Sequence, residues 1–172
     1  MKKKIKSLHY PKISFKYNTK IISKSSDARI YTDCILLTEG EYSDSIGRQP
    51  VVYSQYELSK AVKNWESNYL NLDHSFEVLK RLGFIKNPHL GKNGEILGDL
   101  YIFPITQTAR DTIALIDNGL INWLSVELTS EDTWDSIVCK RNATDIRFIG
   151  AAIVTYPADS NTRVIKDGPA PK

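Results

Sequence analysis

Residues that hold metals or build disulfide frameworks are scarce in this chain. It has two cysteines, Cys34 and Cys139, far apart in the sequence, and three histidines, His9, His74 and His89. No pair among them has metal-ligand spacing, so we expect neither a metal site nor a cofactor. Both cysteines are interpreted as reduced, structural residues of a cytoplasmic protein.

Long apolar runs are also missing. The chain starts with a lysine-rich stretch, but lysines recur at positions 12, 16, 20 and 24. A signal peptide would need an uninterrupted apolar run of about seven residues there. We find neither internal repeats nor a glycine-rich phosphate loop. No apolar stretch elsewhere approaches the length of a membrane span. The sequence therefore predicts no membrane partner.

Acidic residues are absent from the first 24 positions, which carry eight lysines. The other 148 residues hold 15 basic and 20 acidic side chains, so the net charge of +3 combines a basic arm with an acidic body. We place this arm at residues 1–26. One interpretation is a solvated, partly disordered tail. The other is docking onto an acidic partner, either protein or nucleic acid.

The remainder has the composition of one globular domain. Apolar residues make up 41% and charged residues 25% of the 172 positions, which is ordinary usage. Short apolar stretches separated by turn residues alternate with two helical patterns, which predicts a β-rich α+β domain over residues 27–160 and a flexible tail over 161–172. The expected strands cover 30–37, 50–53, 68–73, 78–86, 95–105, 119–129, 134–139 and 146–156.

The helices are predicted from cap residues and spacing. Ser54 and Glu57 have capping-box spacing, and Leu58, Ala61, Val62 and Trp65 follow at helical intervals. Thr108 and Asp111 form a second cap pair, and Asn118-Gly119 ends that helix. Residues 87–94 read as a loop. A turn at 130–133 is expected to join strand 119–129 to strand 134–139.

Residues 119–129 carry the first candidate for chemistry. Leu124, Val126 and Leu128 alternate with Ser125 and Glu127, so the leucines and the valine are expected to face the core. Ser125 is then a hydroxyl on a rigid strand. Such a serine is a nucleophile only if a base lies within hydrogen-bond reach, and many are simply solvated.

His74 is the candidate base. It ends a stretch in which Leu70 and Leu72 alternate with Asn71 and Asp73. That alternation predicts His74 on the side of the leucines, at least partly sheltered, where a core histidine is the alternative interpretation. A Ser/His hydrolase requires only that His74 and Ser125 meet in space, and sequence spacing does not test this.

Several segments, taken in order, resemble one family. These are residues 35–42 with 50–53, 71–74 with His74, 94–102, 124–128 with Ser125, and 144–158. Together they are similar to the prohead (capsid maturation) serine proteases of tailed bacteriophages and archaeal tailed viruses, which are related in fold to the herpesvirus assemblins. The resemblance covers about residues 30 to 160.

This resemblance implies a partly open β-barrel with flanking helices and a serine endopeptidase. Ser125 would attack the scissile carbonyl, and His74 would take its proton. The substrates would be viral scaffold and major capsid proteins, and the enzyme itself, inside the assembling procapsid in the host cytoplasm. A homo-oligomer is left open.

The third catalytic member departs from the family pattern. Family members carry an acid near the position of Gly150, and a glycine cannot orient a histidine. Glu127 lies two residues from Ser125 on the same strand face and is the favoured substitute. Asp145 is the competitor, and Asp73 is expected to point away from His74.

Two other functions stay open. One is a capsid or scaffold interaction module that keeps the fold without the chemistry. The other is nucleic-acid binding by the lysine-rich arm, which lacks the interleaved arginines and the aromatic platform typical of such binders.

Overall fold

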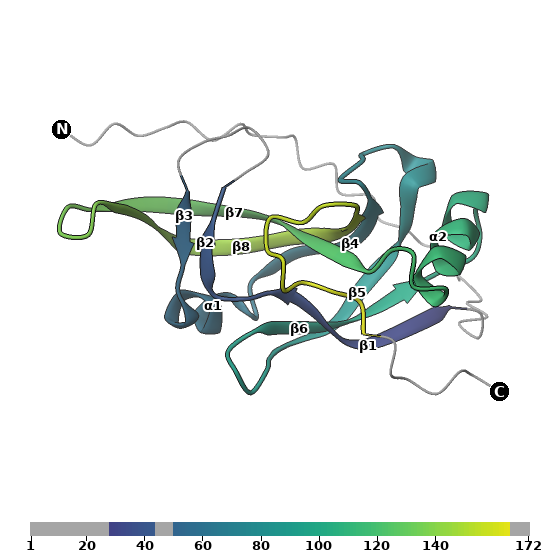
Figure 1. Ribbon diagram of the computed structural model, residues 1–172, viewed down its shortest axis with the longest axis horizontal. Coiled ribbons are helices and arrows are strands. Elements are labelled where there is room, and N and C mark those ends of the chain that lie inside the picture. The colour runs from purple at the N-terminus through teal and green to yellow at the C-terminus, as the bar shows by residue number, and fades with distance from the viewer. Residues whose placement is uncertain (1–27, 44–49, 166–172) are drawn as a thin grey trace, which may run out of the picture.

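A single curled sheet dominates the computed structural model, which describes residues 28–43 and 50–165. Within that part of the chain, eight strands form the sheet and two α-helices flank it (Figure 1). The predicted class, an α+β fold built on a partly open barrel, is confirmed. The predicted arm and the end of the predicted tail lie outside the described residues.

The sheet is mixed, with β8 as its central strand. The order is β1-β6-β5-β4-β8-β3-β2, and β7 pairs with β8 off this path. Strands β3 and β4 run parallel to β8, and the other pairs are antiparallel. The elements are β1 (Arg29–Leu37), β2 (Gly40–Tyr42), β3 (Val51–Tyr53), α1 (Gln55–Ala61), β4 (Trp65–Leu72), the 3-10 turn η2 (Val78–Lys80), β5 (Arg81–Leu90), β6 (Ile96–Ile102), α2 (Gln107–Asp117), β7 (Trp123–Asp135) and β8 (Lys140–Val154).

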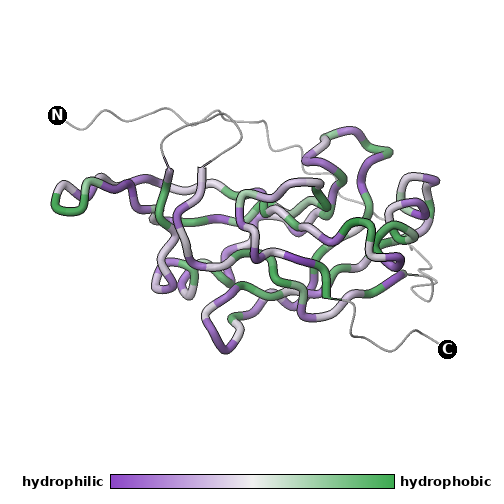
Figure 2. The backbone as a smooth tube through the Cα atoms, in the orientation of Figure 1, coloured by the Kyte–Doolittle hydropathy of each residue, from purple (hydrophilic) through white to green (hydrophobic). Residues whose placement is uncertain are grey.

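The core lies inside the curl of the sheet. Fully buried side chains from β1, β4, β6, β7 and β8 meet there, among them Leu36, Leu70, Leu100, Leu124 and Phe148. Hydrophobic stretches therefore follow the barrel strands, whereas the arms of the projecting β7–β8 hairpin are mostly hydrophilic and its turn is hydrophobic (Figure 2). Burial of this apolar surface is the main contribution that stabilises the curl.

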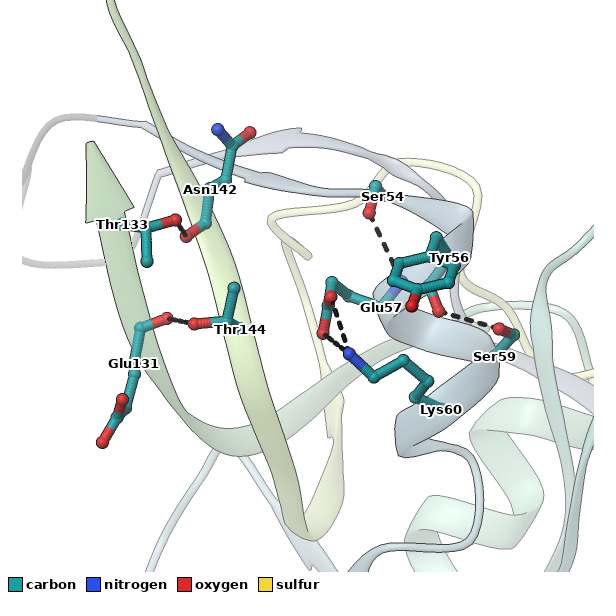
Figure 3. Close-up of polar contacts among 9 residues, drawn as sticks. All are labelled: Ser54, Tyr56, Glu57, Ser59, Lys60, Glu131, Thr133, Asn142 and Thr144. Atoms are coloured by element: carbon teal, nitrogen blue, oxygen red, sulfur yellow. Dashed lines mark hydrogen bonds and ion pairs between the residues drawn. The ribbon is translucent and has the colours of Figure 1, made fainter. Parts of the chain in front are cut away.

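The first helix starts as the cap residues predict. The Ser54 hydroxyl accepts a hydrogen bond from the Glu57 backbone N–H at 3.3 Å (Figure 3). Placing Trp65 on this helix was wrong, because α1 ends at Ala61. Trp65 begins β4, and its ring stacks on Phe148 with centroids 4.7 Å apart.

The second helix begins earlier than expected. Its N-cap is Thr106, whose hydroxyl accepts from the Ala109 N–H at 3.1 Å. Thr108 is inside the helix, where its carbonyl accepts a hydrogen bond from the Thr112 hydroxyl. The expected loop at 87–94 also starts too early, because β5 continues to Leu90.

The β7–β8 hairpin is longer than predicted. The expected turn at 130–133 and partner strand at 134–139 are wrong: β7 continues to Asp135, and the turn spans residues 136–139. Thr144 Oγ1 donates to the Glu131 carbonyl at 3.1 Å, and Thr133 Oγ1 donates to the Asn142 carbonyl at 3.4 Å (Figure 3). The end of the hairpin projects beyond the core, so its residues show no alternation of apolar and polar side chains that would predict its strands from the sequence.

A closing strap, which we define as residues 159–165, bridges the gap between β1 and β7 (yellow in Figure 1). Arg163 and Ile35 exchange two backbone hydrogen bonds of 3.0 Å, and the Val164 N–H donates to the Asn122 carbonyl at 2.8 Å. The Thr162 hydroxyl donates to the carbonyl of Leu124. Residues 161–165, expected in a flexible tail, therefore pack against the barrel.

The start of the strap is held by a buried carboxylate. Asp159 is 3% exposed, and it accepts hydrogen bonds of 2.7 Å from both the N–H and the hydroxyl of Thr38. The Asn161 N–H donates to its other oxygen at 2.9 Å. These polar anchors carry no periodic apolar signal, which explains why the sequence predicts residues 161–165 as part of a flexible tail.

Candidate active site

Three neighbouring strands bring the candidate residues to one face of the sheet. Ser125 on β7 pairs with Ala152 on β8, which pairs with Asn71 on β4. In the next row, Glu127 pairs with Gly150. Because laterally paired residues share a face, Ser125, Asn71 and Glu127 all lie on the side opposite the core. The alternation expected for β7 is found, with Leu124 fully buried behind Ser125.

His74 reaches this face because the chain turns after β4. Asp73 and His74 have φ values of 50° and 53°, in the left-handed region that Asp and His visit more readily than most residues. The Asp73 N–H donates to the Ile153 carbonyl at 2.9 Å, which fixes the turn on β8. Strand alternation ends at Leu72, so placing His74 among the leucines was wrong. Its side chain is 42% exposed.

The imidazole of His74 contacts the carboxylate of Glu127. His74 Nδ1 lies 3.1 Å from Glu127 Oε1. A carboxylate only accepts hydrogen bonds, so Nδ1 carries the proton and Nε2 is left as the acceptor in the neutral ring. This is the tautomer that a general base for serine requires. The Glu127 side chain is 13% exposed, so the contact is partly shielded from water.

Ser125 is partly exposed on the same face. Among residues 28–43 and 50–165, the Ser125 hydroxyl has no hydrogen-bond partner, so no structural contact holds its oxygen away from a substrate. His74 and Ser125 are therefore on one face but not hydrogen-bonded. Contacts between a nucleophile and its base are often long in the absence of substrate.

Of the two acids considered as the third catalytic member, Glu127 and Asp145, only one lies near His74. Gly150, near which the resemblance to the prohead proteases places an acid, is the cross-strand partner of Glu127. A Cβ on Gly150 would stand 2.6 Å from the Tyr69 carbonyl oxygen, so a side chain there would displace β4. Asp145 lies toward the other end of β8 and bonds Arg147 at 2.9 Å. The structure brings Glu127 to His74 and does not bring Asp145 there.

Asn71 was not predicted as a site residue. Its side chain is 1% exposed, and its Nδ2 lies 3.4 Å from Glu127 Oε1. The sequence offered one signal, since the alternation of β4 already puts Asn71 opposite the leucines. Burial of a polar side chain on that face depends on residues of other strands, so alternation alone does not reveal it.

The other candidate residues lie apart from this face. Cys34 is buried and Cys139 is exposed in the hairpin turn, and both are free thiols. Burial raises the pKa of Cys34 to about 12. His89 Nδ1 lies 2.8 Å from the Asn87 carbonyl oxygen on β5. Among the described residues there is no cluster of His, Cys, Asp and Glu able to hold a metal.

No helix in the described part of the chain has the length and apolar character needed to cross a bilayer.

A comparison with known proteins identifies a solved structure of similar fold. No protein-family model and no curated protein matches the sequence. Among solved structures, the chain is similar to the capsid assembly protease gp21 of bacteriophage T4, with a TM-score of 0.50 and 14% sequence identity. The match covers 76% of this chain and 98% of that one. The chain therefore shares the fold of a phage prohead protease.

Proposed function

We propose that this protein is a serine endopeptidase that cleaves viral scaffold and capsid proteins, and itself, during head maturation. Its fold is that of a capsid assembly protease. The observation that carries the proposal is the 3.1 Å contact between His74 Nδ1 and Glu127 Oε1 on the sheet face that bears Ser125. Nucleophile, base and orienting acid would thus come from β7 and the turn after β4.

The proposed chemistry is acyl transfer. Ser125 Oγ attacks the scissile carbonyl carbon and gives its proton to His74 Nε2, while the carbonyl oxygen becomes an oxyanion stabilised by backbone N–H groups. Glu127 stabilises the imidazolium that forms. The C–N bond then breaks, and His74 returns the proton to the departing amine. Water, activated by the same imidazole, releases the acyl group from Ser125.

The likeness to a capsid assembly protease supports scaffold and capsid proteins as the proposed substrates. We infer that this chain acts inside the assembling procapsid. The basic arm would deliver the enzyme by contacting acidic segments of those proteins, since eight lysines without an acid form a strong cation.

Co-expression with the scaffold protein of the same virus tests the activity. We expect wild type to cleave the scaffold, and Ser125→Ala and His74→Ala each to abolish cleavage. The double mutant should be no worse, because residues that act as one unit are non-additive. Gel electrophoresis and product mass spectrometry measure the outcome.

Ser130→Ala provides the matched control. Ser130 lies on the same strand and its hydroxyl bonds Asp132, so its loss should leave cleavage intact. The folding stability of Ser125→Ala should change by less than about 0.5 kcal/mol, as for other surface substitutions. Full cleavage by Ser125→Ala would refute the assignment.

A catalytically silent capsid or scaffold module is the second candidate. It is favoured by one observation: the Ser125 hydroxyl is not hydrogen-bonded to His74 in the described residues. Co-purification of uncut scaffold with wild type, together with no cleavage product, would support the module instead of the enzyme.

A further inference from the structure

Asn71 is a buried polar residue that the mechanism above does not use. It lies on β4, in the row that leads through Ala152 to Ser125. Its side chain is 1% exposed, and its Nδ2 donates to Glu127 Oε1 at 3.4 Å. That oxygen is the same one that accepts from His74 Nδ1. Asn71 therefore contacts the carboxylate from the sheet while His74 contacts it from the turn.

The orientation of the amide is set by the carboxylate. Asn71 Oδ1 is buried and has no hydrogen-bond donor among the described residues, an arrangement that is unfavourable for folding. Reversing the amide would put Oδ1 against the Glu127 oxygen, where two acceptors repel. The amide is thus oriented so that its Nδ2 donates to the Glu127 carboxylate, while its own Oδ1 is left without a hydrogen-bond donor among the described residues.

Other neighbours of Glu127 offer no substitute. Its carboxylate has two hydrogen-bond partners in the described part of the chain, His74 and Asn71. Gly150, its cross-strand partner, has no side chain. Tyr69, in the same row, faces the guanidinium of Arg81, whose Cζ lies 3.6 Å from the ring centroid. Without Asn71, His74 would be the one remaining hydrogen-bond partner of the Glu127 carboxylate among the described residues.

We propose that Asn71 is a positioning residue, which holds the Glu127 carboxylate toward His74 Nδ1 and so maintains the tautomer that the proposed serine protease needs. This inference rests on the proposed function. A glutamate side chain has several rotamers, and a second, sheet-borne donor restricts them. If that donor is lost, the carboxylate is free to turn toward solvent, and the ring then loses its preference for a proton on Nδ1.

Asn71→Leu tests the inference, with Asn68→Leu as the matched control. Leucine has the same branched shape as asparagine and removes both the donor and the unsatisfied oxygen. Asn68 lies on the same strand but donates to the Ile85 carbonyl at 3.0 Å, so its replacement removes a purely structural hydrogen bond. Two readouts are measured: peptide cleavage kinetics, and the His74 tautomer from its ¹⁵N chemical shifts, assigned by comparison with His74→Ala.

We expect Asn71→Leu to lower kcat about three- to tenfold with KM nearly unchanged. The Nδ1–H tautomer of His74 should become less populated, while the Tm is unchanged or higher. Asn68→Leu should lower the Tm and leave kcat and the tautomer alone. If Asn71→Leu does not fold, Asn71→Asp keeps the shape, replaces the donor with an acceptor, and should shift the tautomer and kcat in the same direction.

A double-mutant cycle separates positioning from an independent effect. Asn71→Leu combined with Glu127→Gln should be no slower than Glu127→Gln alone. Unchanged kcat and tautomer in Asn71→Leu, or losses that multiply in the double mutant, would overturn the inference. A wild type that cleaves nothing but shows the Nδ1–H tautomer, lost in Asn71→Leu, would refute the protease function and keep the positioning role.

Discussion

Glu127 illustrates how a carboxylate can reach a histidine from a neighbouring strand. The prohead proteases that the sequence resembles carry an acid near Gly150, and Gly150 is the direct cross-strand partner of Glu127. Paired residues of adjacent strands present their side chains to the same face, a few ångströms apart. In the proposed site, an acid on β7 would therefore take the place of an acid on β8 with little change in where the carboxylate lies. The tight contact of Gly150 with Tyr69 favours this exchange.

The role of Glu127 leads to the first residue-scale prediction. Glu127→Gln should lower the cleavage rate at least tenfold, because a neutral amide stabilises the imidazolium less than a carboxylate does. A tenfold loss corresponds to about 1.4 kcal/mol of transition-state stabilisation. Steady-state kinetics on a scaffold-derived peptide measures the effect.

Asp145→Asn is the comparison variant for that measurement. Asp145 is paired with Arg147 on the exposed part of β8, so its change should have little effect. If Asp145→Asn is damaging and Glu127→Gln is silent, the third member is misassigned although the Ser/His pair stands. If both are silent, the enzyme works as a dyad.

Residue periodicity predicted part of this site. The alternation of β7 was sufficient to put Ser125 and Glu127 on one face, because a strand has a fixed period of two. The same rule failed at His74, where two residues with positive φ follow Leu72. Their conformation depends on how the turn docks on β8, through the Asp73 N–H and the Ile153 carbonyl, which the local sequence does not encode.

At the scale of elements, the closing strap connects the site to the rest of the barrel. It runs between β1 and β7, and it bonds the Leu124 carbonyl next to Ser125. Apolar alternation predicted the barrel strands because they are half-buried. Apolar alternation did not reveal that residues 161–165 pack on the barrel, because hydrogen bonds with distant residues hold them there. It also placed the turn of the β7–β8 hairpin too early, because the end of this hairpin extends away from the core.

The strap gives an element-scale prediction. Asp159→Ala removes a buried carboxylate that three donors contact, two of them on Thr38. We expect a loss of about 2–3 kcal/mol in the free energy of unfolding, because charge-assisted hydrogen bonds are lost and donors are left unpaired. Chemical denaturation measures it.

Ser160→Ala is the control for the strap, since Ser160 is exposed on the same segment. It should change the unfolding free energy by less than about 0.5 kcal/mol. Equal stability of the two variants would show that the strap lies on the barrel without holding it closed.

The whole molecule combines an acidic body with a lysine-rich arm. Composition and strand patterns predicted the β-rich α+β class, and the resemblance to the prohead proteases implied the partly open barrel. The likeness of the fold to a capsid assembly protease agrees with both. The arm lies outside the described residues, and its charge is the basis for its proposed role. Attraction between such a cation and acidic partners weakens as salt rises.

Deletion of residues 1–24 tests the arm at this scale. Cleavage of a short peptide should remain intact, whereas incorporation into procapsids should fall, because the proposed catalytic face lies on the barrel and the proposed role of the arm is electrostatic attraction alone. Quantitative blotting of purified particles measures incorporation. A full-length variant with the eight lysines changed to glutamine should behave like the deletion, and unchanged packaging in both would show the arm to be passive.

Covalent labelling of Ser125 tests the central claim most directly. A fluorophosphonate reacts with a serine whose hydroxyl is activated by a neighbouring base, and peptide mass spectrometry locates the adduct. The account predicts one adduct, on Ser125, that disappears in His74→Ala and weakens in Glu127→Gln. An adduct elsewhere, no adduct in a chain that cleaves scaffold, or labelling of Ser125 that does not depend on His74 would contradict it.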